Sequence, residues 1–280
     1  MVAVAGLAVV LGVGGVAYAV RGDGLGPVVA AGERTAAAGS ARVEILTLLD
    51  GGVGQPKQRI DATGVVDFAS SARYLDFRVG PAQTEVPDGA GGVALSVVEV
   101  DGDSYYRYAS WDAGQPWLRT TGSPDDPDDS AGEAGLGSLA LDDVVLGNRW
   151  DVLRDGVVDV RELGEETVRG ERTRRYSVDV DLSRVALDPE LGDALQRVAR
   201  QGMVLDVWVS DRIHRVRYVL DAGSANVAAG DAAAGPAGGV GPGASVATVI
   251  EYHDFGVPAA IEAPGNALDD TLTGGEGEGS

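Results

Sequence analysis

The feature that most constrains this fold is an alternation of apolar and polar side chains within residues 163–182, which read LGEETVRGERTRRYSVDVDL. From Tyr176 to Leu182 every second residue is apolar, and the residues between them are Ser or Asp. Because the side chains of a strand point alternately to its two faces, this stretch predicts a strand with one dry and one wet face. Residues 157–168 predict a preceding strand, and Arg169-Gly170-Glu171 predicts a tight turn between the two. The dry face of this hairpin must be covered by something apolar.

The composition argues against several classes of function. The 280 residues carry a formal net charge of −21, which is unfavourable for binding nucleic acid or for electrostatic docking on an anionic membrane. The chain has no Cys, so disulfides, thiolate catalysis and Cys-based metal sites are excluded. Its hydrophobic content of 44% is enough for a real core. The length predicts one domain of ordinary size with appendages, or two small domains.

The amino-terminal segment predicts a compartment. Residues 2–20 are nineteen residues without a charge, followed by Arg21, and as a helix they would span roughly 28 Å, close to the thickness of a bilayer's hydrocarbon layer. Ala17-Tyr18-Ala19 fits a signal-peptidase site, but no basic residue precedes the apolar run. Residues 1–21 are therefore predicted to be a retained transmembrane anchor, with a cleaved signal peptide or a buried core helix as alternatives. Either membrane interpretation places the remainder at the extracytoplasmic face of the cell membrane, or outside the cell if the segment is cleaved.

The rest of the chain predicts many strands and few helices. Residues 22–27 form a glycine-rich tether, residues 222–243 a flexible loop and residues 265–280 a disordered acidic tail. Short turns between the strands favour antiparallel pairing. The predicted fold class is α+β, a large curved antiparallel β-sheet in the form of a half-barrel wrapped around inserted helices. Helices are predicted at residues 27–39, 139–153 and 188–202. Further strands are predicted at residues 41–49, 58–68, 73–79, 93–100, 104–109, 117–120, 203–210, 213–221 and 244–252.

Several segments, in their order and spacing, resemble a known family. They are residues 33–42 (ERTAAAGSAR), 64–68 (GVVDF), 157–160 (VVDV) with Tyr176 and 179–182 (DVDL), 205–209 (LDVWV) with 215–217 (RVR), 254–258 (DFGVP) and 262–264 (EAP).

Together these segments resemble the actinobacterial LppX/LprA/LprF/LprG lipoprotein family, whose fold is related to that of the LolA lipoprotein carriers. The resemblance covers residues 28–264, which we treat as one lipid-binding-like domain. It implies a half-open antiparallel sheet wrapped around helices, enclosing a hydrophobic cavity that binds or carries acylated lipids and glycolipids at the cell envelope. The family's lipid-modified Cys is missing here, which rules out a lipid anchor. A retained amino-terminal helix would replace that tether.

No metal, cofactor or catalytic site is predicted. The only two histidines, His214 and His253, fall on different predicted strands without a clustered ligand set. The acidic run at residues 125–129 is interrupted by Pro127, which favours a solvated loop over a calcium site. The chain contains no Gly-x-Ser-x-Gly motif. These observations predict that the protein is not an enzyme.

Two side-chain clusters keep alternative interpretations. Arg169, Arg172, Arg174 and Arg175 suit either an anionic headgroup or, as we favour, a charged hairpin edge that discourages aggregation. An aromatic cluster suits either core packing or the lining of an apolar pocket. That cluster consists of Tyr105, Tyr106, Tyr108, Trp111 and Trp117.

The predicted function is a membrane-tethered extracytoplasmic protein that binds or carries a lipid or acylated glycolipid in a cavity beneath the curved sheet. Burial of acyl chains would supply about 0.8 kcal/mol per methylene. The alternative is a non-enzymatic envelope sensor or protein-interaction module with the same fold and no open cavity. Core packing is likewise the alternative role of the residues predicted to line the cavity. Those residues are Val65, Phe77, Tyr106, Tyr176, Val178, Val180, Leu205, Val207, Tyr218, Ile250 and Tyr252.

Overall fold

The computed structural model describes residues 25–50, 57–82, 93–111, 114–120, 156–181, 184, 203–221 and 245–269. These residues form one helix and one twelve-stranded sheet. The helix is α1 (Leu25–Ala37). The strands are β1 (Ser40–Asp50), β2 (Gln58–Asp67), β3 (Arg73–Pro81), β4 (Val93–Val100), β5 (Asp103–Tyr108), β6 (Leu118–Thr120), β7 (Val157–Val168), β8 (Glu171–Val180), β9 (Met203–Val209), β10 (Ile213–Asp221), β11 (Ser245–His253) and β12 (Leu268–Asp269).

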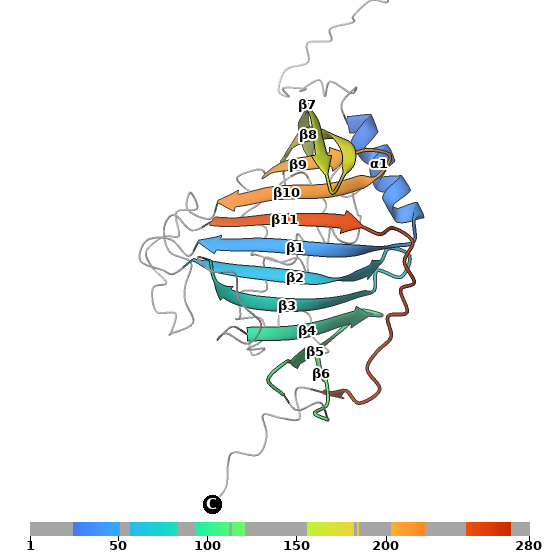
Figure 1. The fold of residues 1–280 in the computed structure, drawn as a ribbon, viewed down its shortest axis with the longest axis vertical. Helices are drawn as coiled ribbons and strands as arrows, with labels where there is room; N and C mark the ends of the chain where they lie inside the picture. The colour runs from blue at the N-terminus through green and yellow to red at the C-terminus, as the bar shows by residue number, and fades with distance from the viewer. Residues whose placement is uncertain are drawn as a thin grey trace, which may run out of the picture.

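The strands lie in the order β12-β6-β5-β4-β3-β2-β1-β11-β10-β9-β8-β7. Neighbouring strands pair antiparallel except for β12 and β6, which pair in parallel. The large antiparallel sheet predicted from the sequence is confirmed, and it curls away from a flat plane at both ends (Figure 1). Because β11 lies between β1 and β10, the last long strand joins the amino-terminal half of the sheet to its carboxy-terminal half.

The central hairpin is confirmed as predicted. β7 and β8 pair along their length, and Arg169 and Gly170 form the turn with φ of 50° and 86°. A tight hairpin turn with two positive φ values follows the right-handed twist of its strands, and glycine reaches this conformation at low cost. Tyr176, Val178 and Val180 are buried, in agreement with the predicted dry face.

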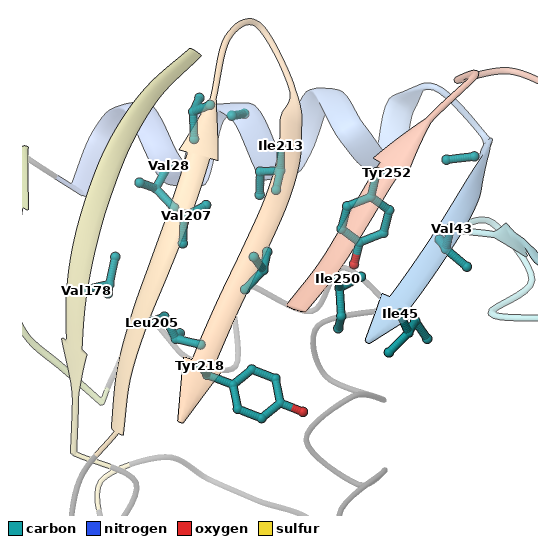
Figure 2. Packing of buried hydrophobic residues seen from close by; sticks show 14 of the residues in the cluster. Val28, Val43, Ile45, Val178, Leu205, Val207, Ile213, Tyr218, Ile250 and Tyr252 are labelled. Carbon is teal, nitrogen blue, oxygen red and sulfur yellow. The ribbon is translucent and has the colours of Figure 1, made fainter. Parts of the chain in front are cut away.

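Helix α1 packs on one face of the sheet, which we call the inner face; the opposite side is the outer face. Val28 and Ala31 of α1 belong to the main core cluster, together with side chains of β1, β9, β10 and β11 (Figure 2). The hydroxyl of Thr35 donates to the Ala31 carbonyl at 2.8 Å and accepts from the backbone N–H of Ile213 at 2.9 Å. A buried backbone donor is thereby satisfied, and the helix is fixed against the start of β10. Gly39, with a φ of 80°, lies just past the helix and leads into β1.

A second, smaller cluster lies on the outer face of β4 and β5. Val98, Tyr105 and Trp117 form it, and Ile261 and Ala267 of the carboxy-terminal segment pack against it. This segment runs from β11 past the ends of the intervening strands to β12, beside β6 (Figure 1). The ordered sheet therefore extends past the boundary that the sequence analysis set at residue 264.

Several predictions fall outside the described residues. They concern the apolar segment at residues 2–20, the helices at residues 139–153 and 188–202, and the loop at residues 222–243. Within the part of the chain that the structure describes, no helix has the length and apolar character needed to cross a bilayer. The predicted transmembrane anchor and inserted helices thus stay predictions.

A candidate ligand-binding surface on the inner face

Three rows of cross-strand neighbours cross the inner face. The clearest, which we call the graded row, takes one residue from each strand between β9 and β4, and its members are Leu205, Tyr218, Thr248, Thr47, Ile60, Val79 and Val93. Leu205 is 0% exposed and Thr47 is 3% exposed, whereas Ile60 and Val79 are half-buried and Val93 is 52% exposed. Burial therefore falls along one row of a single face, from β9 toward β4.

The part of the inner face between β8 and β1 is closed. Leu205, Val207 and Ile250 are each 0% exposed, and Tyr218 is 1% exposed; Figure 2 shows these side chains on neighbouring strands. A side chain without accessible surface borders neither solvent nor a void large enough for a water molecule, so these residues are tightly packed. A ligand could reach them only by displacing protein atoms that pack on them.

The part formed by β4, β5 and β6 is half-open. Two further rows run beside the graded row and end on these strands in half-buried apolar side chains. We call this set of side chains the apolar wall, and its members are Leu95, Val97, Tyr106, Tyr108 and Leu118. Leu95 and Val97 also pack against the main core cluster, so the wall continues the core without a break. Its two tyrosines each combine an apolar ring with a polar hydroxyl. The wall is the described part of the inner face on which an apolar molecule could lie without unfolding the core.

Nine of the eleven residues predicted to line a cavity lie together in the main core cluster. They are Phe77, Tyr176, Val178, Val180, Leu205, Val207, Tyr218, Ile250 and Tyr252. Tyr106 lies on the inner face as part of the apolar wall. The structure thus brings ten of these residues to one face and leaves Val65 apart.

Val65 lies on the outer face. Its register partners Arg42 and Tyr74 belong to that face, whereas the neighbouring Val66 is 3% exposed and lies in the main core. Gly64 has no side chain and so does not indicate which face of the strand is apolar. Val65 and Val66 are themselves equally apolar. The charged side chains of Asp61 and Asp67 share Val65's phase and indicate the exposed side. Val65 therefore points to the outer face, and its neighbour Val66 is the residue of β2 that packs in the core.

The aromatic cluster is divided between the two faces. Tyr106 and Tyr108 have ring centroids 6.0 Å apart, and Trp111 lies 5.1 Å from Tyr108. Tyr105 and Trp117 belong instead to the second cluster on the outer face. Four members of the apolar wall were not among the predicted lining residues, namely Leu95, Val97, Tyr108 and Leu118. Alternation within residues 93–100 could have indicated the first two, because Leu95 and Val97 share the phase of one face.

One ion pair lies on the inner face beside the wall. Arg73 pairs with Glu99, which is two residues from Val97 on β4, and the Arg73 side chain is only 11% exposed. On the outer face behind the wall, the hydroxyl of Tyr74 donates to Asp76 at 2.8 Å. Burial is the largest cause of the raised pKa of Tyr74. The polar groups on the wall's own face include the two tyrosine hydroxyls, this charged pair and Ser104, which lies opposite Glu99.

The four hairpin arginines all pair with carboxylates. Arg172 pairs with Glu165 and Arg174 with Glu162 at 3.7 Å, both across the hairpin. Arg175 contacts Asp206 at 2.7 Å and Glu166 at 3.1 Å, and Arg169 contacts Glu251 at 2.8 Å and also Glu44. These arginines are therefore engaged within the protein itself.

One arrangement bears on catalysis. Ser210 and the Nε2 atom of His214 are 2.8 Å apart, and burial lowers the pKa of His214. Among the described residues, none hydrogen-bonds the other ring nitrogen, the position that an orienting carboxylate takes in a catalytic triad. Among the described residues, no group of three or more His, Asp or Glu side chains is arranged to hold a metal ion.

No family model matches the chain, and no curated protein matches its sequence. Solved structures with similar folds include LprF from Mycobacterium bovis, with 14% identity, a TM-score of 0.42, and coverage of 85% of this chain and 94% of that one. LppX from Mycobacterium tuberculosis has 14% identity, a TM-score of 0.39, and coverage of 85% and 100%. A DUF1329 family protein from Desulfovibrio piger has 13% identity, a TM-score of 0.29, and coverage of 84% and 95%. These likenesses are long but weak, so the family resemblance remains a prediction.

Proposed function

We propose that this chain is a non-enzymatic extracytoplasmic protein that binds an apolar or acylated ligand, a lipid or glycolipid, on the inner face of its sheet. The observation that carries the proposal is the graded row, in which full burial ends at β1 and exposure rises through β2 and β3 to β4, while the apolar character of the inner face continues to β6. A half-open apolar surface continuous with a core is a common form of ligand site. The apolar segment at residues 2–20 supports a tether to the membrane.

The chemistry of binding follows from the side chains of the wall. Covering the remaining apolar area would contribute about 25 cal/mol per Å². Tyr106, Tyr108 and the Arg73–Glu99 pair are the nearby groups that can hydrogen-bond a polar end of the ligand. No proton transfer or covalent step is required.

The second candidate is an envelope sensor or protein-interaction module with the same fold and no open cavity. The zero exposure of Leu205, Val207 and Ile250 favours it, because those residues leave no space for a ligand between β9 and β11. Under this alternative the apolar wall would contact another protein.

The test is extraction and native mass spectrometry of the full chain purified from membranes. The proposal expects a co-purified lipid, and a rise in melting temperature when that lipid is added back. Tyr106→Ala should weaken binding about tenfold through lost apolar contact. Arg107→Ala, one residue along β5 on the outer face, should leave binding unchanged. Repeated recovery of ligand-free protein, with no thermal gain from added lipids, would favour the interaction module.

A further inference from the structure

The far end of the β7–β8 hairpin is a separate structural feature that lies across the outer face. Residues 164–173 pair only within the β7–β8 hairpin, because β8 begins to pair with β9 at Arg174. We call these ten residues the ribbon. A bulge between Glu162 and Gly164, with Gly164 at a φ of 121°, lets the hairpin bend there. The ribbon therefore leaves the sheet as a two-stranded piece, a structure of marginal stability by itself.

Contacts from two points of the ribbon reach the outer face of other strands. At its tip Arg169 donates to Glu251 of β11 at 2.8 Å, and it also pairs with Glu44 of β1. Near its base Glu166 accepts from the indole N–H of Trp208 on β9 at 2.7 Å. The ribbon thus reaches from β9 to β1 over the outer face, and Figure 1 shows the hairpin curling over the neighbouring strands.

Little apolar surface holds the ribbon in place. Val168 and Thr173 are its only buried residues, and its other members are half-buried or exposed. Exposed ion pairs contribute little individually, and they weaken with salt and with protonation of their carboxylates. The attachment therefore combines the burial of Val168 with several charge pairs, and the charge pairs are the part that acid and salt weaken.

The presence of an arginine at position 169 of the turn supports a role for its side chain. Its φ of 50° lies in the left-handed region, which Gly, Asn and Asp occupy at lower cost than Arg does. An arginine there strains the turn while supplying the contacts to Glu44 and Glu251. From these observations we propose that the ribbon is an electrostatic latch, closed over Trp208 near neutral pH and released by acid or high salt.

The charged groups around the latch give the direction of its pH dependence. Burial opposes ionisation of Glu251, but hydrogen bonds from Arg169 and Arg215 outweigh it and lower the pKa of Glu251. Hydrogen bonds from Trp208 and Arg175 lower the pKa of Glu166. A carboxylate with a lowered folded pKa stabilises the closed form above its ordinary pKa, and that stabilisation is lost as the pH falls through the folded value. Release is therefore expected below about pH 4.

Other charged groups face the same contacts. His253 of β11 has its Nε2 3.6 Å from Glu44 and its Nδ1 3.2 Å from Asp254. Asp254 in turn lies 3.5 Å from Arg42 of β1. Under the latch, Arg175 and Arg215 lie over the Trp208 ring at 4.9 Å and 5.3 Å, and Arg175 also pairs with Asp206. Opening would expose Trp208 together with these two cations.

The experiment uses the absence of cysteine from the natural chain. Thr167→Cys, an exposed ribbon position, is labelled with bimane in the full chain, and Trp208 quenches the label while the latch is closed. The label should brighten as the pH falls below about 4, and again in about 1 M salt at neutral pH, before far-ultraviolet circular dichroism reports unfolding. Trp208→Phe should remove the quenching at every pH.

A matched pair of variants separates the latch from a general charge effect. Arg169→Asn keeps a residue suited to the turn but removes both contacts, and it should raise the ratio of open to closed forms about fivefold at neutral pH. Arg172→Asn removes the same charge from a pair internal to the ribbon and should leave the ratio unchanged. Amide exchange of residues 165–173 measures the same ratio without a label. Equal behaviour of the two variants, or quenching that persists until global unfolding, would overturn the proposal.

Discussion

The two halves of the inner face differ in burial although they share one pattern of side chains. Between β8 and β1 the rows are apolar and closed, with Leu205 and Ile250 at 0% exposure. Between β4 and β6 the same rows continue through Leu95 and Val97, which are half-buried. Alternation along a strand determines which face a side chain occupies. It does not determine whether that face is covered, and this difference separates core from candidate site.

The largest expected effect is the difference in stability between two leucine-to-alanine substitutions, one in each half of the inner face. Leu205→Ala should lower the free energy of unfolding by about 3 to 4 kcal/mol, because it leaves a cavity in a tightly packed region. Leu95→Ala should cost about 1 kcal/mol, because solvent and neighbouring side chains can fill the space. Urea denaturation of both variants measures the difference. Equal costs would show that the two halves are packed alike.

A second prediction concerns Gly64 of β2, next to the strand at which burial ends. A Cβ atom there would lie 1.9 Å from the backbone carbonyl oxygen of Tyr74, so the backbone of β2 or β3 would have to move. Gly64→Ala should destabilise the protein by about 2 to 3 kcal/mol. The control is Gly26→Ala in α1, where an added Cβ meets nothing within 4 Å and alanine favours the helix. The melting temperature should fall for Gly64→Ala and rise for Gly26→Ala.

A third prediction uses the buried polar pair of the closed half. The hydroxyls of Thr47 and Thr248 are 3.1 Å apart and hydrogen-bond each other where apolar residues surround them. Thr248→Val should cost about 1 to 2 kcal/mol, because it leaves the Thr47 hydroxyl buried without this partner. The double variant with Thr47→Val should regain most of that loss. A double variant as unstable as the sum of the singles would show that the two hydroxyls are not coupled.

The smallest effect concerns pH and His214, beside the closed half. Burial lowers the pKa of His214, while Glu171 and Asp211 oppose the shift and Arg212 adds to it. Its ring also packs nearly perpendicular to that of Phe255 at a centroid distance of 5.6 Å. Because the unfolded chain takes up this proton first, stability should fall as the pH drops below about 6.5, by less than about 1.4 kcal/mol per pH unit. His214→Gln should flatten the slope between about pH 7.5 and pH 5.5 in urea titrations; an unchanged slope would exclude His214 as its source.

Most of the sheet was predictable because its physical signals are local. The turn at Arg169-Gly170 and the alternation from Tyr176 onward identified the central hairpin, and β4 and β10 were predicted at their observed bounds. Burial of charged side chains is costly, so residues of alternating polarity allow few choices of face. The short strand β12 was missed, because a two-residue parallel pair leaves no periodic pattern.

The candidate site was predictable only in part. Tyr106 lies on the inner face, and its predicted role in lining a cavity stays a prediction; its partial exposure depends on strands distant in sequence. For Val65, the adjacent Gly64 and Val66 do not indicate which face of β2 is apolar, and only Asp61 and Asp67, farther along the strand, mark its side as the exposed one. The contacts of Arg169 with Glu44 and Glu251 join residues far apart in the chain, and no short-range signal encodes them.

Ligand protection of single cysteines tests the central claim most directly. Val97→Cys lies on the apolar wall and Ser96→Cys lies beside it on the outer face of β4, in a chain that otherwise has no thiol. We expect oleate, or the lipid recovered by extraction, to slow modification of Val97→Cys by a water-soluble thiol reagent about tenfold while leaving Ser96→Cys unchanged. Equal slowing at both positions, or no slowing at Val97→Cys while the ligand is bound, would contradict a binding site on the half-open inner face.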